Sequence, residues 1–209
     1  MNTSSVFTFI FLLCAFVSCT AAVLEANDAV RDIGGKKIRF GTKYAILPVL
    51  RGPGGGVTME RDNSSCPNAV IQERFDVSSG TPVTFHPVNT KKGVVRESTD
   101  MNIIFSPEMH AKGGSSCSSS YVWRLGPYDE VTKQRFVTTG GIEGNPGPAN
   151  VGSWFKIVRN GEYYNLLFCP SVCKFCKVVC GNVGIYVDED GVRRLALSEV
   201  PFRVMFRKV

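Results

Sequence analysis

The chain has 209 residues, of which 44% are hydrophobic and 20% are charged, and its formal net charge is +6. This length allows one substantial hydrophobic core or at most two small ones. The basic residues occur as scattered pairs such as Lys36 and Lys37 rather than as a dense run. That distribution argues against a nucleic-acid-binding arm, so we expect no nucleic-acid partner.

The N-terminus carries an apolar run of twelve residues, 6–17, which is too short for a membrane-spanning helix. Small residues follow it up to Ala22, although no Lys or Arg precedes it. We interpret residues 1–22 as a cleavable secretory signal and residues 23–209 as a single mature domain; the alternative is a buried strand or an anchor. No later segment approaches the length of a membrane helix, so we expect a secreted chain without membrane contact after cleavage.

Six cysteines remain in this mature domain, and four of them form a compact string near the C-terminus. The string suits either a four-thiolate metal site or two nested disulfides. Because exported chains meet an oxidising environment, we favour three disulfides without metal, for which about fifteen pairings are possible. The six residues are Cys66, Cys117, Cys169, Cys173, Cys176 and Cys180.

Short runs rich in Val, Ile, Phe and Tyr alternate with Gly, Pro, Asn and Ser along the whole chain, which predicts strands rather than helices. Asn160-Gly161 and Asp190-Gly191 are two-residue hairpin signals. The Gly-rich segments 51–56 and 140–148 are expected to be flexible loops. The predicted strands are 43–50, 69–75, 83–86, 94–96, 101–105, 121–125, 134–138, 154–158, 163–169, 184–187, 192–197 and 202–207.

This many strands on one core imply a barrel or a two-sheet sandwich. Residues 30–38 resemble residues 187–195, and residues 123–125 resemble residues 155–157. Weak self-similarity with a period of about fifty residues indicates a threefold unit.

The remaining candidate residues have simple interpretations. Neither His86 nor His110 lies in a catalytic motif, so we expect no enzyme. Asn63 begins an Asn-Ser-Ser sequon and is a predicted glycosylation site, with an unused surface turn as the alternative. Arg193 and Arg194 are interpreted as a basic strand edge that discourages further pairing.

Specific motifs make the chain similar to the plant Kunitz inhibitors of the soybean trypsin inhibitor type, and closely to their miraculin-like branch. The resemblance covers residues 28–207 and begins with the pattern Val30-x-Asp32-x-x-Gly35-x-x-Ile38, followed by Tyr44-x-Ile46. The other matching segments are 47–50, 96–100, 144–148, 153–156, 168–170, 188–197 and the four-cysteine string.

The resemblance implies a β-trefoil, in which twelve strands form three pseudo-repeats and a six-stranded barrel is closed by hairpins. It also implies the pairings Cys66–Cys117, Cys169–Cys180 and Cys173–Cys176. In a plant, the secreted chain would reach the extracellular space or the cell wall, or the vacuole.

The resemblance further implies a reactive loop that is offered to a serine protease as a substrate mimic. By alignment, Lys91 would fill the specificity pocket of a trypsin-like protease, and Lys92 follows it. The alternative is an ordinary turn, since Gly93 loosens the loop and Phe40 stands where inhibitory relatives place a supporting Asn.

Two functional hypotheses therefore stand at this point. The first is a monomeric, cofactor-free inhibitor of trypsin-like serine proteases in plant defence. The second is a non-inhibitory trefoil that binds carbohydrate, a receptor or another protein, and a variant of the first would inhibit cysteine proteases through another loop.

Overall fold

The computed structural model of the chain describes residues 28–60, 69–106 and 120–209. The predicted signal segment, Asn63, His110 and the proposed Cys66–Cys117 pair lie outside the described residues. Among the residues it does describe, no helix has the length and apolar character needed to cross a membrane.

The regular secondary structure of the described residues is almost entirely β-strand, as the sequence predicts. Eleven of the twelve predicted segments overlap a strand, and 101–105 and 134–138 match their strands at both ends. Two short 3-10 helices, η1 (Thr90–Lys92) and η3 (Pro148–Ser153), lie in the connections. The strands are β1 (Tyr44–Pro48), β2 (Val57–Met59), β3 (Val70–Gln72), β4 (Val83–Pro87), β5 (Met101–Phe105), β6 (Arg124–Asp129), β7 (Gln134–Thr138), β8 (Lys156–Asn160), β9 (Tyr163–Phe168), β10 (Gly181–Val187), β11 (Arg193–Ser198) and β12 (Arg203–Lys208).

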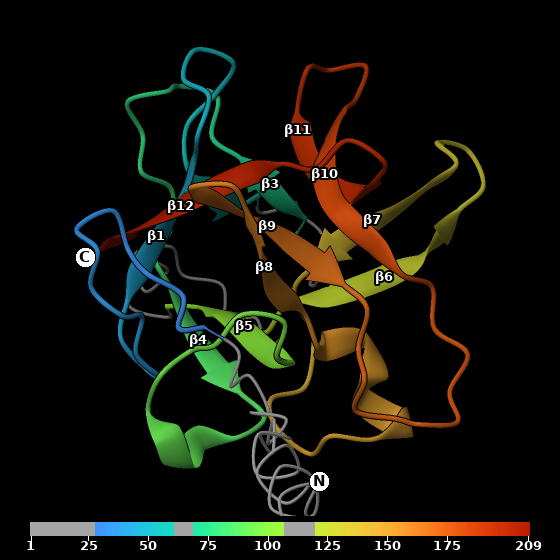
Figure 1. Cartoon of the computed structure of the whole chain (residues 1–209). Coiled ribbons are helices and arrows are strands. Elements are labelled where there is room, and N and C mark those ends of the chain that lie inside the picture. Colours follow the sequence, from blue (N-terminus) through green and yellow to red (C-terminus); the bar gives the residue numbers. More distant parts are fainter. Residues whose placement is uncertain (1–27, 61–68, 107–119) are drawn as a thin grey trace, which may run out of the picture.

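Six strands pair in a circle. β5 pairs with β4, β4 with β1, β1 with β12, β12 with β9 and β9 with β8, all antiparallel. Figure 1 shows β1, in blue, beside β12, in red, so the first and last strands of the chain are neighbours. The circle is completed by an isolated bridge between Met101 of β5 and Phe155, the residue before β8, whose backbone groups exchange hydrogen bonds of 2.8 and 2.9 Å.

The other six strands form three hairpins, β2–β3, β6–β7 and β10–β11, which meet one another. β11 pairs with both β3 and β7, and a bridge joins Ala69 to Thr138. Each third of the chain therefore supplies two strands to the circle and one hairpin, which is the β-trefoil arrangement. This pairing also corrects the interpretation of Arg193 and Arg194, because β11 is bordered by three strands and is not an edge.

One apolar core fills the space inside the circle and beneath the hairpins. Both tryptophans, Trp123 and Trp154, are buried, as are Phe85, Phe155 and Phe206. Phe105, Trp123, Phe155 and Phe168 form a chain of tilted and edge-to-face ring contacts with centroids 5.4 to 6.0 Å apart. This ring chain joins the second and last thirds of the chain, and the edge-to-face contact of Phe85 with Phe206, with centroids 5.3 Å apart, joins the first third to the last.

The two glycine-rich segments are loops, as predicted, and close contacts hold parts of both. In segment 51–56, a side chain on Gly55 or Gly56 would collide with backbone carbonyl oxygens of the 75–79 segment, so these glycines permit close backbone packing. β2, which was not predicted, follows directly. Segment 140–148 is also held, because Asn102 accepts a hydrogen bond of 2.8 Å from Gly144 N.

Candidate functional site

The connection between β4 and β5, residues 88–100, carries Lys91 and is called the β4–β5 loop here. Lys91 is exposed and lies within the short helix η1. Asn89 caps the start of η1, with Oδ1 accepting a hydrogen bond of 3.2 Å from Lys91 N. Gly93 ends it in the left-handed conformation, with φ of 59° and a 3.0 Å hydrogen bond from its N to Thr90 O. Lys91 therefore lies in a capped helical turn rather than in an extended segment (Figure 1, green).

The second half of the β4–β5 loop is held by the N-terminal segment, residues 28–40. The predicted strand 94–96 is present only as single bridges to this segment, at Val94 and Arg96. Val95 between them is fully buried. The backbone hydrogen bonds are Val30 N to Val95 O (3.0 Å), Val95 N to Ile38 O (2.9 Å), Phe40 N to Gly93 O (3.2 Å) and Glu97 N to Asp28 O (2.8 Å).

Phe40 supports the loop through its backbone, while its side chain packs elsewhere. The Phe40 ring lies edge-on to the ring of His86, with centroids 4.7 Å apart. His86 Nδ1 is 2.5 Å from a carboxylate oxygen of Glu143, and Nε2 is 3.0 Å from the Thr84 hydroxyl. The aromatic side chain offers no hydrogen-bond donor to the loop, so the turn depends on its own caps.

Arg159 of β8 braces the loop from the other side. Its guanidinium donates to Glu97 Oε1 from Nε and Nη2, at 3.0 and 2.5 Å, and lies over the Tyr164 ring. The hydrogen bonds to Glu97 raise the pKa of Arg159 above its ordinary value, against the opposing effect of burial. The charged Arg159 guanidinium thus fixes the end of the loop to the barrel.

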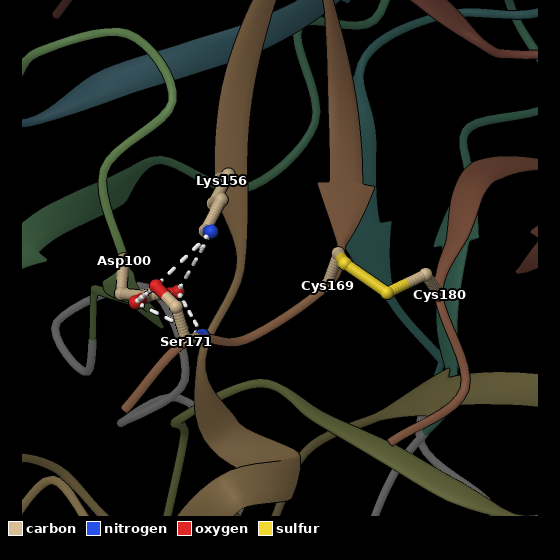
Figure 2. Close-up of a disulfide and its surroundings, with 5 residues drawn as sticks. All are labelled: Asp100, Lys156, Cys169, Ser171 and Cys180. Carbon is tan, nitrogen blue, oxygen red and sulfur yellow. Dashed lines mark hydrogen bonds and ion pairs between the residues drawn. A yellow bond between two sulfur atoms is a disulfide. The ribbon is translucent and has the colours of Figure 1, made fainter. Parts of the chain in front are cut away.

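Asp100, the last residue of the loop, joins it to the cysteine string (Figure 2). Its backbone O accepts a 2.9 Å hydrogen bond from Val88 N, which closes the base of the loop. Its buried carboxylate accepts hydrogen bonds from Ser171 N, at 3.1 and 3.2 Å, and from the Ser171 hydroxyl at 2.5 Å. Lys156 Nζ lies 3.7 Å from Asp100 Oδ1 and donates to the Ser171 hydroxyl at 3.2 Å. Sequence reasoning missed this cluster, whose signal is an Asp immediately before an apolar strand.

The cysteine string forms two nested disulfides, Cys169–Cys180 and Cys173–Cys176, which are the pairs that the resemblance implies for it. Their sulfur atoms are therefore not free thiolates, and the four-thiolate zinc alternative does not apply. In the described part of the chain, no group of three His, Cys, Asp or Glu residues is placed to hold a metal ion. Within the cysteine string, Phe175 lies between Lys174 and Cys176 and is 80% exposed.

Comparison with known proteins identifies the family to which this trefoil belongs. A family model described as trypsin and protease inhibitor, of the legume Kunitz type, matches residues 30–208. The chain belongs to this Kunitz inhibitor family. The family match, the fold and the two described disulfides thus agree with the resemblance that the sequence motifs indicate.

Individual relatives carry different names. The chain is 47% identical to miraculin of Synsepalum dulcificum, with 96% of this chain and 94% of miraculin covered. It is 46% identical to Kunitz trypsin inhibitor 5 of Arabidopsis thaliana, with 98% of each covered. A solved Kunitz-type cysteine protease inhibitor from potato superposes with a TM-score of 0.74 at 34% identity, covering 88% of this chain and 98% of the potato protein. The family is made up of protease inhibitors and miraculin-like proteins, which are not enzymes.

Proposed function

We propose that the protein is an exported inhibitor of trypsin-like serine proteases that presents Lys91 as a substrate mimic. The observation that carries this proposal is the position of Lys91, which is exposed between loop residues that are fixed by backbone hydrogen bonds and by Glu97 and Asp100. A lysine ammonium suits a protease pocket that ends in a carboxylate. Holding the flanks of a loop reduces the entropy lost on docking.

The capped turn limits the strength of this inhibition. A protease cleft that pairs with its substrate as an added strand needs an extended segment, whereas Thr90–Lys92 is helical. Binding must break the hydrogen bonds made by Lys91 N and Gly93 N, each of which contributes about 1 kcal/mol. We therefore expect weaker inhibition than from a trefoil whose loop is already extended, by about tenfold or more.

The test is a titration of trypsin with the mature protein and with Lys91→Ala. Inhibition that is lost in Lys91→Ala, and kept in Lys208→Ala, supports the proposal; Lys208 is an exposed lysine of β12. Mass spectrometry of the complex should find slow cleavage after Lys91 only. Absence of inhibition at micromolar protein, or equal inhibition by Lys91→Ala, contradicts it.

The cysteine string supports a second candidate, inhibition of a cysteine protease. The Cys173–Cys176 disulfide closes a small covalent ring of the chain in which Phe175 is exposed. The Cys169–Cys180 disulfide encloses this ring in the sequence. The potato structure described above carries the name of a cysteine protease inhibitor. Such a ring is rigid and needs no unwinding, unlike the Lys91 turn.

Papain distinguishes the two candidates. Under the second candidate, Phe175→Ala abolishes papain inhibition, whereas Lys91→Ala leaves it unchanged. If neither trypsin nor papain is inhibited, the non-inhibitory hypothesis remains, and a glycan array would then test carbohydrate binding.

A further inference from the structure

An apolar groove lies away from both candidate protease-binding loops. It has a volume of about 370 Å³ and is bordered by the β1–β2 connection, the β11–β12 connection and strands β3, β10 and β11. Leu50 and Val200, which are 70% and 76% exposed, stand at its rim, and Ile185 and Phe202 contribute to its wall. The volume is within the range of small-molecule sites, about 300–1,000 Å³.

The polar groups of the groove are predominantly cationic. Arg193 and Arg203 line it, and none of its lining residues is an Asp or a Glu. Arg203 also lies over the Tyr163 ring, 5.3 Å from its centroid. Within the described ranges, neither guanidinium forms an ion pair with a carboxylate. Two uncompensated cations beside an apolar surface favour an anion that carries a hydrocarbon body.

Gln72 fixes one of these cations. Its side chain is 3% exposed, and its Oε1 accepts a 2.8 Å hydrogen bond from Arg193 Nε. This bond leaves the two terminal nitrogens of the guanidinium available and holds their plane in one orientation. A guanidinium that is already oriented binds a carboxylate with less loss of side-chain entropy.

Gln72 also contains an unsatisfied donor. Because Arg193 donates to Oε1, the amide orientation is set, and Nε2 points away from the guanidinium. This buried nitrogen has no hydrogen-bond partner in the described structure and lies beneath Gly54. An unpaired buried donor costs stability, so the arrangement at Gln72 is not one that core packing alone would favour. What Gln72 contributes to the groove is its Oε1, which holds the Arg193 guanidinium there.

We propose that the groove binds an amphipathic monocarboxylate. The carboxylate contacts Arg193 and Arg203, Gln72 acts as a positioning residue, and the hydrocarbon body lies against Phe202, Ile185 and Leu50. This binding site is independent of the proposed inhibition, because its lining includes no residue of the β4–β5 loop or of the cysteine string.

Octanoate and its uncharged analogue 1-octanol test the proposal by isothermal titration calorimetry. Octanoate should bind at one site, at least about tenfold more tightly than 1-octanol, because only the carboxylate pairs with the guanidiniums. In NMR spectra of the protein, the chemical shift perturbations caused by octanoate should be centred on Phe202 and Arg193. Equal affinity for the two compounds, or no saturable octanoate binding, overturns the proposal.

Variants test the assignment of residues. Arg193→Gln and Arg203→Gln should each weaken octanoate binding about tenfold without changing 1-octanol binding. Gln72→Leu should weaken octanoate binding by a smaller factor and should leave 1-octanol binding unchanged. Arg207→Gln, on the same strand as Arg203 but outside the groove, is the matched control and should bind like the unmodified protein. Because Arg203 is exposed, its substitution should not impair folding, and undiminished octanoate binding by Arg203→Gln would contradict the site.

Discussion

At the residue scale, Gly93 sets the conformation of the Lys91 turn, because its φ of 59° is disfavoured for a residue with a side chain. An added Cβ at Gly93 would meet no atom within 4 Å, so substitution alters backbone preference without creating a clash. Gly93→Ala should therefore destabilise the turn by about 1 kcal/mol and favour the extended form. We expect it to strengthen trypsin inhibition about fivefold, measured as the inhibition constant.

Gly93→Asn is the matched control, because Asn tolerates the left-handed conformation better than Ala does. It should leave the inhibition constant close to that of the unmodified protein. Weaker inhibition by Gly93→Ala would mean that the helical turn itself is the form that the protease recognises.

At the scale of elements, Asp100 joins the base of the β4–β5 loop to the cysteine string. Replacing it with Asn removes the charge near Lys156 and places an NH₂ group or a weaker acceptor against Ser171. The free energy of unfolding should fall by about 2–3 kcal/mol, as measured by urea denaturation. Ser171→Ala removes only part of the cluster and should cost about 1 kcal/mol. Equal stability of Asp100→Asn and the unmodified protein would show that the cluster does not brace the loop.

The β10–β11 hairpin carries a pH-sensitive contact at Asp188. Burial acts to raise the pKa of this carboxyl, but hydrogen bonds from Arg194 and from Val192 N, with the charge of Arg194, outweigh it and leave the pKa below its ordinary value. A lowered folded-state pKa means that the contact stabilises the protein fully above the unfolded-state pKa of about 3.9. The stabilisation is lost as the pH falls from there through the lowered folded-state pKa.

Asp188→Asn should therefore lose less stability than the unmodified protein when the pH is lowered from about 5 to about 2. The urea midpoint, measured at several pH values, reports the difference. Asp190→Asn, an exposed neighbour in the same connection, is the control and should follow the unmodified protein. Parallel pH profiles for Asp188→Asn and the unmodified protein would contradict the assignment.

At the scale of the molecule, alternating apolar strands and turn residues predicted most of the fold. The pattern failed where tertiary contacts decide the structure. β2 follows glycines whose role is close backbone approach to residues 75–79, which no local pattern reveals. The sequence around Val95 predicts a strand, but the segment forms only single bridges and hydrogen bonds with the N-terminal segment.

The candidate site was predictable only in part, for a related reason. The position of Lys91 follows from alignment, but its helical turn depends on Asn89 and Gly93 acting together as caps. Local sequence shows Asp100 immediately before an apolar strand but not its partner, because Ser171 lies 71 positions away. The same holds for Gln72 and Arg193, which are 121 positions apart and meet because β3 and β11 pair.

Phe206 tests whether the thirds of the trefoil unfold as one unit. It is fully buried in β12, and its ring lies 5.3 Å from Phe85 of β4 and 5.6 Å from Tyr164 of β9, measured between centroids. Phe206→Ala should lower the free energy of unfolding by about 3–5 kcal/mol, because a cavity remains where the first and last thirds meet. The urea transition should stay single, with an unchanged slope. Phe175→Ala, at an 80% exposed site, should change stability by less than about 0.5 kcal/mol. A two-step transition in Phe206→Ala would show that the thirds do not share one cooperative core.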